Sequence, residues 1–206
     1  MAIQQPDFTY WNQVGDDFLQ NDADNPARTY VAGVVLEYLA DHQRRSIGMI
    51  EVGPGMGFDY ERAFDFDGDV PYGCRFHYCM IEGSSGLVER LRRKFPQADV
   101  KLGTFTDLQP MDCKIIYAKA VFEHQPELRE PLLAFLCCAT DMAIITWYRP
   151  PKEEGNTELT LSHDGCYYAT WRKADVLAVA HEAGWKDEEL RIVKIGTNEV
   201  WFWRRK

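Results

Sequence analysis

Three closely spaced glycines are the first residues of this 206-residue chain whose pattern points to chemistry. They lie in the segment 51–57, EVGPGMG, at the end of the short apolar run 47–52. A run of this kind is typical of a strand that is buried on both faces. Open parallel sheets bind ligands beyond the carboxyl ends of their strands, where a glycine backbone can approach a ligand closely. The alternative is a tight turn without a ligand.

The residues around the glycines disfavour two common ligands of such loops. A dinucleotide fingerprint, as for NAD or FAD, requires its last glycine at position 58, where the chain has Phe58. A phosphate-binding loop requires Lys and then Ser or Thr, but Gly57 is followed by Phe58 and Asp59. The acidic residues Glu51 and Asp59 instead fit a ligand that bears positive charge.

The segment 51–57 resembles the first motif of the class I S-adenosylmethionine-dependent methyltransferases, Asp/Glu-x-Gly-x-Gly-x-Gly. The resemblance extends from about residue 28 to the end of the chain. It implies S-adenosylmethionine as the cofactor, with Glu51, Gly53, Gly55 and Gly57 among the residues that bind it.

An acidic residue also follows the next expected strand, as the resemblance requires. The run 76–81 predicts a strand, and Glu82 stands at its end. The two oxygens of a carboxylate can accept hydrogen bonds from both hydroxyls of a ribose. The resemblance therefore implies that Glu82 binds the sugar of the cofactor. The alternative is a surface acid at a strand end.

The segment after the third expected strand departs from the family pattern. The strand is predicted over 100–102, and Thr104 stands where the family often has an aspartate near the adenine. The adenine contact therefore comes either from Thr104 with the Phe105 backbone or from Asp107. The sequence leaves both alternatives open.

The segment 117–124, YAKAVFEH, resembles the Leu-Glu-His segment after the fourth strand of small-molecule and quinone methyltransferases. Within it, Lys119 is a further candidate for cofactor binding and His124 is the candidate general base. A histidine with its ordinary pKa of about 6.5 suits proton transfer at neutral pH. Such a base is needed only where the acceptor atom carries a proton. The alternative for His124 is a histidine bonded to backbone at a helix start.

Strands and helices alternate along most of the chain, which predicts an α/β fold with a mainly parallel sheet. Strands are expected over 47–52, 76–81, 100–102, 113–118, 142–148, 190–195 and 199–203, and helices from Asn25-Pro26, over 84–95, from Pro131 and over 174–183. The residues Gly196-Thr197-Asn198 indicate a hairpin turn between the last two strands. With the resemblance, the expected fold is a Rossmann-like, seven-stranded methyltransferase fold with helices on both faces and an antiparallel C-terminal edge hairpin.

Two segments fall outside this alternation. Residues 1–24 are polar with scattered aromatic side chains, and we expect them to wrap a single domain formed by residues 25–206. Residues 147–171 are rich in aromatic side chains without clear periodicity. They are expected to form a long loop that either covers the acceptor or packs as core under the hairpin. Arg28 is expected to be solvated at its helix start, with contact to the cofactor carboxylate as the alternative.

Charge and composition disfavour several classes of protein. The chain has 23 Lys+Arg against 32 Asp+Glu, a formal charge of −9, which disfavours nucleic acid or an anionic membrane as a partner. No apolar run is long enough to span a bilayer, and the first residues lack the pattern of a signal peptide. We therefore expect a cytoplasmic protein with most of its six cysteines reduced. No metal site is expected, because His and Cys lack ligand spacing and Asp65-x-Asp67-x-Asp69 lacks the glycine of a calcium loop.

Together these patterns predict an enzyme that transfers a methyl group from S-adenosylmethionine to an oxygen or nitrogen of a small-molecule acceptor. The competing hypothesis is a methyltransferase-like binding module without catalysis that acts through a partner protein. The sequence identifies neither the acceptor nor the oligomeric state.

Overall fold

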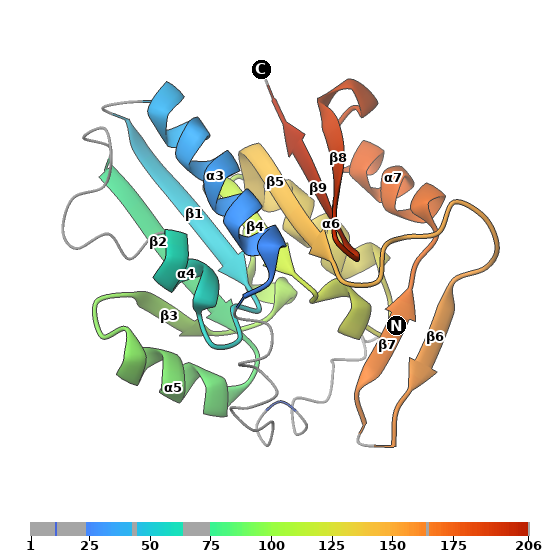
Figure 1. Ribbon diagram of the computed structural model, residues 1–206, viewed down its shortest axis with the longest axis horizontal. Helices are drawn as coiled ribbons and strands as arrows, with labels where there is room; N and C mark the ends of the chain where they lie inside the picture. The colour runs from blue at the N-terminus through green and yellow to red at the C-terminus, as the bar shows by residue number, and fades with distance from the viewer. Residues whose placement is uncertain (1–10, 12–23, 43–44, 64–74, 164, 206) are drawn as a thin grey trace.

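The computed structural model describes Trp11 and residues 24–42, 45–63, 75–163 and 165–205 (Figure 1). The main sheet consists of β1 (Ser46–Val52), β2 (Arg75–Glu82), β3 (Asp99–Leu102), β4 (Cys113–Lys119), β5 (Ala139–Trp147), β8 (Leu190–Ile195) and β9 (Asn198–Arg204). These seven strands are ordered β3-β2-β1-β4-β5-β9-β8. The first five are parallel, and β9 runs antiparallel to both β5 and β8. The mainly parallel sheet with an antiparallel C-terminal edge hairpin is thus confirmed.

Helices cover both faces of the sheet, as expected (Figure 1). The helices are α3 (Pro26–Asp41), α4 (Phe58–Ala63) and α5 (Ser85–Lys94) on one face, and α6 (Arg129–Cys138) and α7 (Lys173–Glu182) on the other. Successive side chains of a strand point to opposite faces, so each buried strand contributes to two cores. In β1, Met49 packs with α3 and α5, whereas Ile50 belongs to the core under α6 and α7.

Local signals explain where three of the helices begin or end. The Asn25 side chain accepts a hydrogen bond from the backbone N–H of Ala27 at 3.0 Å and caps α3. Ser84 Oγ caps α5 in the same way, with the N–H of Leu87 at 3.2 Å. Gly184 follows α7 with a positive φ of +83°, a backbone conformation that favours glycine.

The expectation of a long loop over residues 147–171 is wrong. This segment contains β6 (Glu158–Leu161) and β7 (Tyr167–Thr170), which form a separate two-stranded antiparallel sheet. Both strands are short, and every side chain of β6 is exposed, so the sequence has no alternation to indicate them. Its aromatic residues are divided between two roles, because Trp147 and Trp171 are buried core and Tyr168 lines a cavity.

Some expectations fall outside the part of the chain that the structure describes. Of the predicted wrapping segment 1–24, only Trp11 and Asp24 are described, so its role stays a prediction. The acidic residues 65–69 and Cys74 also lie outside. The other five cysteines have free thiols. Within the described ranges, no helix is long and apolar enough to cross a membrane.

Candidate functional site

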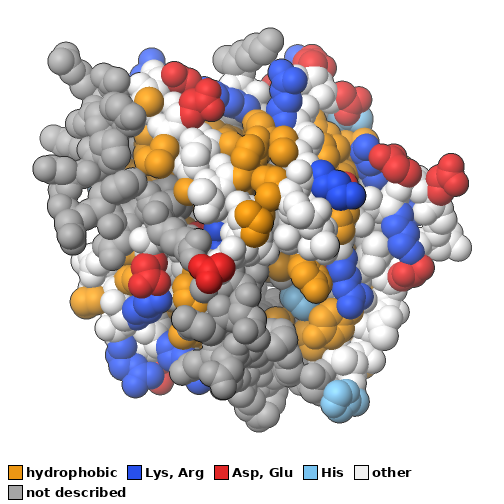
Figure 2. Space-filling view, viewed as in Figure 1, with side chains coloured by type: hydrophobic (Ala, Val, Ile, Leu, Met, Phe, Trp, Pro, Cys, Tyr) orange, Lys and Arg blue, Asp and Glu red, His pale blue; other side chains and the backbone are white. Residues whose placement is uncertain are grey.

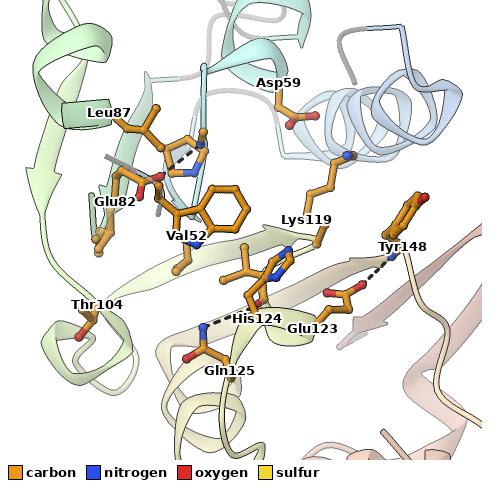
Figure 3. Close-up of a pocket in the computed structure, with 18 of the residues that line it drawn as sticks. Val52, Asp59, Glu82, Leu87, Thr104, Lys119, Glu123, His124, Gln125 and Tyr148 are labelled. Atoms are coloured by element: carbon orange, nitrogen blue, oxygen red, sulfur yellow. Dashed lines mark hydrogen bonds between the residues drawn. The ribbon is translucent and has the colours of Figure 1, made fainter. Parts of the chain in front are cut away.

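A cavity of about 440 Å³ lies at the carboxyl ends of β1, β2 and β4. From β1 the chain continues to β2 and β3 on one side of the sheet and then crosses to β4 on the other side of β1. The carboxyl end of β1 is therefore a topological switch point of the sheet. In the space-filling view, hydrophobic side chains gather beside a histidine on this face of the molecule (Figure 2). The ends of the three strands and the segments that follow them supply most of the cavity wall (Figure 3).

The glycine loop after β1 has the backbone conformation that only glycine adopts readily. Gly53, Gly55 and Gly57 have φ of +67°, +58° and +70°. Gly53 and Gly55 line the cavity, and a Cβ added at Gly55 would meet no atom within 4 Å. Gly57 is not among the lining residues, and a Cβ there would lie 2.5 Å from Phe95 Cε2. Gly55 therefore leaves the cavity wall open, whereas the missing Cβ atoms of Gly53 and Gly57 make room for the side chains of Val121 and Phe95.

Glu82 connects this loop to the end of β2. Its side chain is 6% exposed and lines the cavity. One carboxylate oxygen accepts the N–H of Ser84 at 2.9 Å, and the other accepts the N–H of Gly55 at 3.3 Å. Burial raises the pKa of Glu82 to about 7. Each oxygen retains a second lone pair, so the carboxylate can accept two further hydrogen bonds from a ligand.

Glu51 lies behind the loop and is not among the residues that line the cavity. It is 1% exposed and accepts a hydrogen bond from the Tyr78 hydroxyl. Burial raises the pKa of Glu51 to about 7, while Tyr78 and the positive charge of Arg28 act in the opposite direction. In this position Glu51 can support the loop from within the core.

The segment after β3 forms the 3-10 turn η2 (Phe105–Asp107). Thr104 and Phe105 line the cavity, and Phe105 stacks on Phe122 with ring centroids 5.0 Å apart. Asp107 is not in the wall. Its carboxylate accepts the N–H of Thr104 at 2.7 Å and so fixes the turn. The geometry places Thr104 and Phe105, but not Asp107, in the wall of the cavity.

The expectation that Arg28 is solvated is wrong. Arg28 is 7% exposed, lines the cavity and forms an ion pair with Asp59, which is 3% exposed. Asp59 lies in α4, a helix that the sequence analysis did not predict. The position of Arg28 at a helix start could not indicate this partner, because the two residues are 31 positions apart.

His124 ends the 3-10 turn η3 (Phe122–His124) and lines the cavity. Its Nδ1 lies 2.9 Å from the carbonyl oxygen of Tyr167 in β7. A carbonyl only accepts hydrogen bonds, so Nδ1 is the donor in this contact and Nε2 keeps its lone pair; Cys166 Sγ also lies 3.3 Å from Nδ1. Burial lowers the pKa of His124, which favours this neutral form. The structure thus combines a backbone hydrogen bond at Nδ1 with an Nε2 that has no hydrogen-bond partner among the described residues.

Glu123 precedes His124 and is a residue to which the sequence analysis gave no role. It is 2% exposed and lines the same cavity. Its Oε1 accepts the backbone N–H groups of Tyr148 at 2.6 Å and Arg149 at 3.2 Å. Burial raises the pKa of Glu123 to about 7, against an ordinary value of 4.5. The sequence signal that could have indicated Glu123 as a site residue is its position within the Leu-Glu-His-like segment.

This shift predicts how the stability effect of Glu123→Gln depends on pH. With its raised pKa, Glu123 holds a proton more tightly in the folded than in the unfolded protein. It therefore contributes stability below about pH 4.5 that is lost as the pH rises through about 7. The variant mimics the protonated side chain, so its unfolding free energy relative to wild type should rise by roughly 1–3 kcal/mol between about pH 5 and about pH 8. Urea denaturation at the two pH values measures this, and an unchanged difference contradicts it.

The structure thus brings together seven of the ten predicted site residues in the wall of one cavity: Gly53, Gly55, Glu82, Thr104, Phe105, Lys119 and His124. The other three, Glu51, Gly57 and Asp107, lie outside the wall. Residues that the sequence analysis did not assign to the site also line it, among them Trp11, Glu123, Gln125 and Arg149. In the described part of the chain, no three His, Cys, Asp or Glu residues are grouped so that they could hold a metal ion.

Comparison with known proteins gives matches in structure but not in sequence. No protein-family model and no curated protein sequence matches the chain. The CurJ carbon methyltransferase matches with a TM-score of 0.62 and 12% identity. The match covers 86% of this chain and 53% of the CurJ chain, so this chain spans about half the length of that protein. A second match is the 1,6-didemethyltoxoflavin-N1-methyltransferase of Burkholderia thailandensis, solved with 1,6-didemethyltoxoflavin and S-adenosylhomocysteine bound. It has a TM-score of 0.62 and 13% identity, and the match covers 92% of this chain and 83% of that one. The fold is that of the class I methyltransferases.

A third structure matches this methyltransferase fold over almost the whole chain. The magnesium protoporphyrin IX methyltransferase of Synechocystis PCC 6803, solved with bound S-adenosylmethionine, has a TM-score of 0.60 and 13% identity. The match covers 97% of this chain and 89% of that one. The resemblance stated from the sequence is therefore confirmed for the fold.

Proposed function

We propose that the protein is an S-adenosylmethionine-dependent methyltransferase whose acceptor is a small molecule methylated at oxygen or nitrogen. The observation that carries this proposal is that one cavity combines the bare glycine loop with the buried carboxylate of Glu82. The methyltransferase fold and the small-molecule enzymes among its structural neighbours support it.

The lining residues fit the chemical groups of this cofactor. Glu82 has lone pairs for the two ribose hydroxyls, and Gly55 leaves room for the ligand beside the loop. The apolar side chains that can face an adenine ring are Val52, Ile81, Leu87 and Phe105. Lys119 and Arg28 can face the carboxylate of the methionine part. The volume of about 440 Å³ lies in the usual range of small-molecule sites, about 300–1,000 Å³.

The remaining wall can position the acceptor. Bound here, S-adenosylmethionine supplies an electrophilic methyl group on a sulfonium. Holding the acceptor in line with that group can contribute about 7–11 kcal/mol of the barrier. Trp11, Tyr148 and Tyr168 offer aromatic surface to the acceptor, and His124 Nε2 can take the proton that an acceptor atom releases.

A substitution in the glycine loop tests cofactor binding. A leucine at Gly55 points into the open cavity, so Gly55→Leu should weaken S-adenosylmethionine binding about tenfold or more, or about 1.4 kcal/mol. Gly196→Leu is the matched control, because Gly196 has a φ of +61° and open space but lies in the β8–β9 turn. Isothermal titration calorimetry measures both. Equal affinities for the two variants and wild type would contradict the proposal.

A second assay separates the enzyme from a non-catalytic binding module. The protein is incubated with a methyl-labelled cofactor and fractionated small-molecule extracts, and labelled product is sought. Transfer that depends on wild-type protein supports catalysis, whereas cofactor binding without any product favours the module. The cytoplasmic location stays a prediction, which cell fractionation tests.

A further inference from the structure

The carboxylate of Glu123 has one oxygen that the protein satisfies and one that it does not. Oε1 accepts two backbone N–H groups, those of Tyr148 and Arg149. Oε2 is fully buried and has no hydrogen-bond partner in the described part of the chain. Leaving a buried polar atom unpaired is costly, more so when the group is charged. Nothing in the proposed cofactor site uses this oxygen, so it points to a ligand.

A second acceptor is offered by the next residue of η3, His124. The hydrogen bond from His124 Nδ1 to the Tyr167 carbonyl leaves Nε2 as a lone-pair acceptor. In Figure 3, the side chains of Glu123 and His124 are drawn next to each other, above Gln125. Both side chains line the cavity from consecutive positions of η3. A ligand that satisfies both groups must bring two donor hydrogens to one place.

This requirement distinguishes between nitrogen and oxygen acceptors. An amino group carries at least two N–H donors, whereas a hydroxyl has a single one. We propose that the methyl acceptor is a primary amine whose nitrogen donates hydrogen bonds to Glu123 Oε2 and His124 Nε2. This inference rests on the proposed methyltransferase function and narrows it to nitrogen. The aromatic side chains of Tyr148 and Tyr168 in the same wall fit an amine on a planar or apolar skeleton.

The charges around Glu123 are compatible with this role. Burial raises the pKa of Glu123, and the positive charge of Lys119 acts in the opposite direction, toward the ionised form. The Arg149 guanidinium lies over the Tyr168 ring, 4.8 Å from its centroid, while the Arg149 backbone holds Glu123 Oε1. The carboxylate is therefore fixed in place by backbone and kept available at Oε2.

The variant Glu123→Gln tests the proposal without removing the fixed contacts. The amide oxygen of glutamine can still accept from Tyr148 and Arg149, while its NH₂ group replaces the free acceptor with a donor. The matched control is Glu127→Gln. Glu127 also has a buried, unpartnered oxygen in the described structure, but it does not line the cavity.

The probes are benzylamine, which is mostly a cation at the pH of the titration, and neutral benzyl alcohol; they share one skeleton and differ in the charge and the number of donor hydrogens. Each is titrated calorimetrically at about pH 8, where Glu123 is ionised, into cofactor-free protein and into protein saturated with S-adenosylhomocysteine. We expect Glu123→Gln to bind benzylamine about 10- to 100-fold more weakly than wild type and Glu127→Gln. Benzyl alcohol should change by about threefold or less, because a hydroxyl can accept as well as donate.

Three results would overturn the inference: benzylamine binds Glu123→Gln as well as wild type, both probes weaken equally, or benzylamine does not bind wild type at all. The titration with S-adenosylhomocysteine alone tests the proposed function independently of the two probes. Failure of that titration counts against the cofactor site, and the titrations of the cofactor-free protein still report on Glu123.

Discussion

Glu82→Ala should abolish the binding of S-adenosylmethionine while the protein remains folded. Glu82 is the acidic residue in the wall that reaches the backbone of the glycine loop, and its remaining lone pairs face the cavity. Two hydrogen bonds from ribose hydroxyls to a carboxylate contribute about 1.5–3 kcal/mol each. Their loss predicts an affinity at least about 100-fold lower, which calorimetric titration measures.

Two further variants make this result specific. Glu89→Ala removes an exposed glutamate from α5 and should leave the affinity unchanged. Glu82→Gln keeps one acceptor oxygen for Ser84 but sets an NH₂ group against the N–H of Gly55, so we expect an intermediate loss. A folded Glu82→Ala protein with wild-type affinity would refute the cofactor site.

Gly57→Ala should be the most destabilising single-methyl change in the glycine loop. Its φ of +70° strains any other residue by about 1–2 kcal/mol. In addition, the new Cβ would lie 2.5 Å from Phe95 Cε2 and 2.9 Å from Leu91 Cδ2, in a well-packed core. Overpacking of this kind costs about 1–3 kcal/mol. The unfolding free energy from urea denaturation should therefore fall by about 2–5 kcal/mol.

Gly33→Ala is the control for this experiment. Gly33 lies exposed inside α3, and a Cβ there meets nothing within 4 Å. Alanine at that position should stabilise the protein by about 0.5–1 kcal/mol, because it favours a helix more than glycine does. If both substitutions change the stability by the same amount, the packing role of Gly57 is wrong.

The sheet and most helices were predictable because their signals are local. Central parallel strands are buried on both faces, so they appear as short apolar runs such as 113–118. The helices α3 and α5 begin directly after Asn25 and Ser84, whose side chains accept hydrogen bonds from the backbone only two or three residues away. The hairpin turn at Gly196 is likewise encoded within three residues, and its glycine has a φ of +61°.

The parts that could not be predicted depend on contacts between distant residues. The burial of Arg28 requires Asp59 from α4, a six-residue helix too short for a periodic pattern. The role of Glu123 depends on the backbone N–H groups of residues 148 and 149, which reach it only when β5 ends beside η3. The motif predicted that Glu51 and Gly57 bind the cofactor together with Gly53 and Gly55. A motif does not show which of its residues face the cavity, and only Gly53 and Gly55 do.

The small β6–β7 sheet has a consequence for how such a protein can diversify. It supplies the carbonyl that orients His124 and the ring of Tyr168, yet it shares no strand with the sheet that carries the glycine loop. Changes in length or sequence around residues 158–170 can therefore alter which molecules enter the cavity, while the glycine loop and Glu82 stay unchanged. In the proposed methyltransferase, acceptor choice and cofactor retention are in this way encoded in separable stretches of one chain.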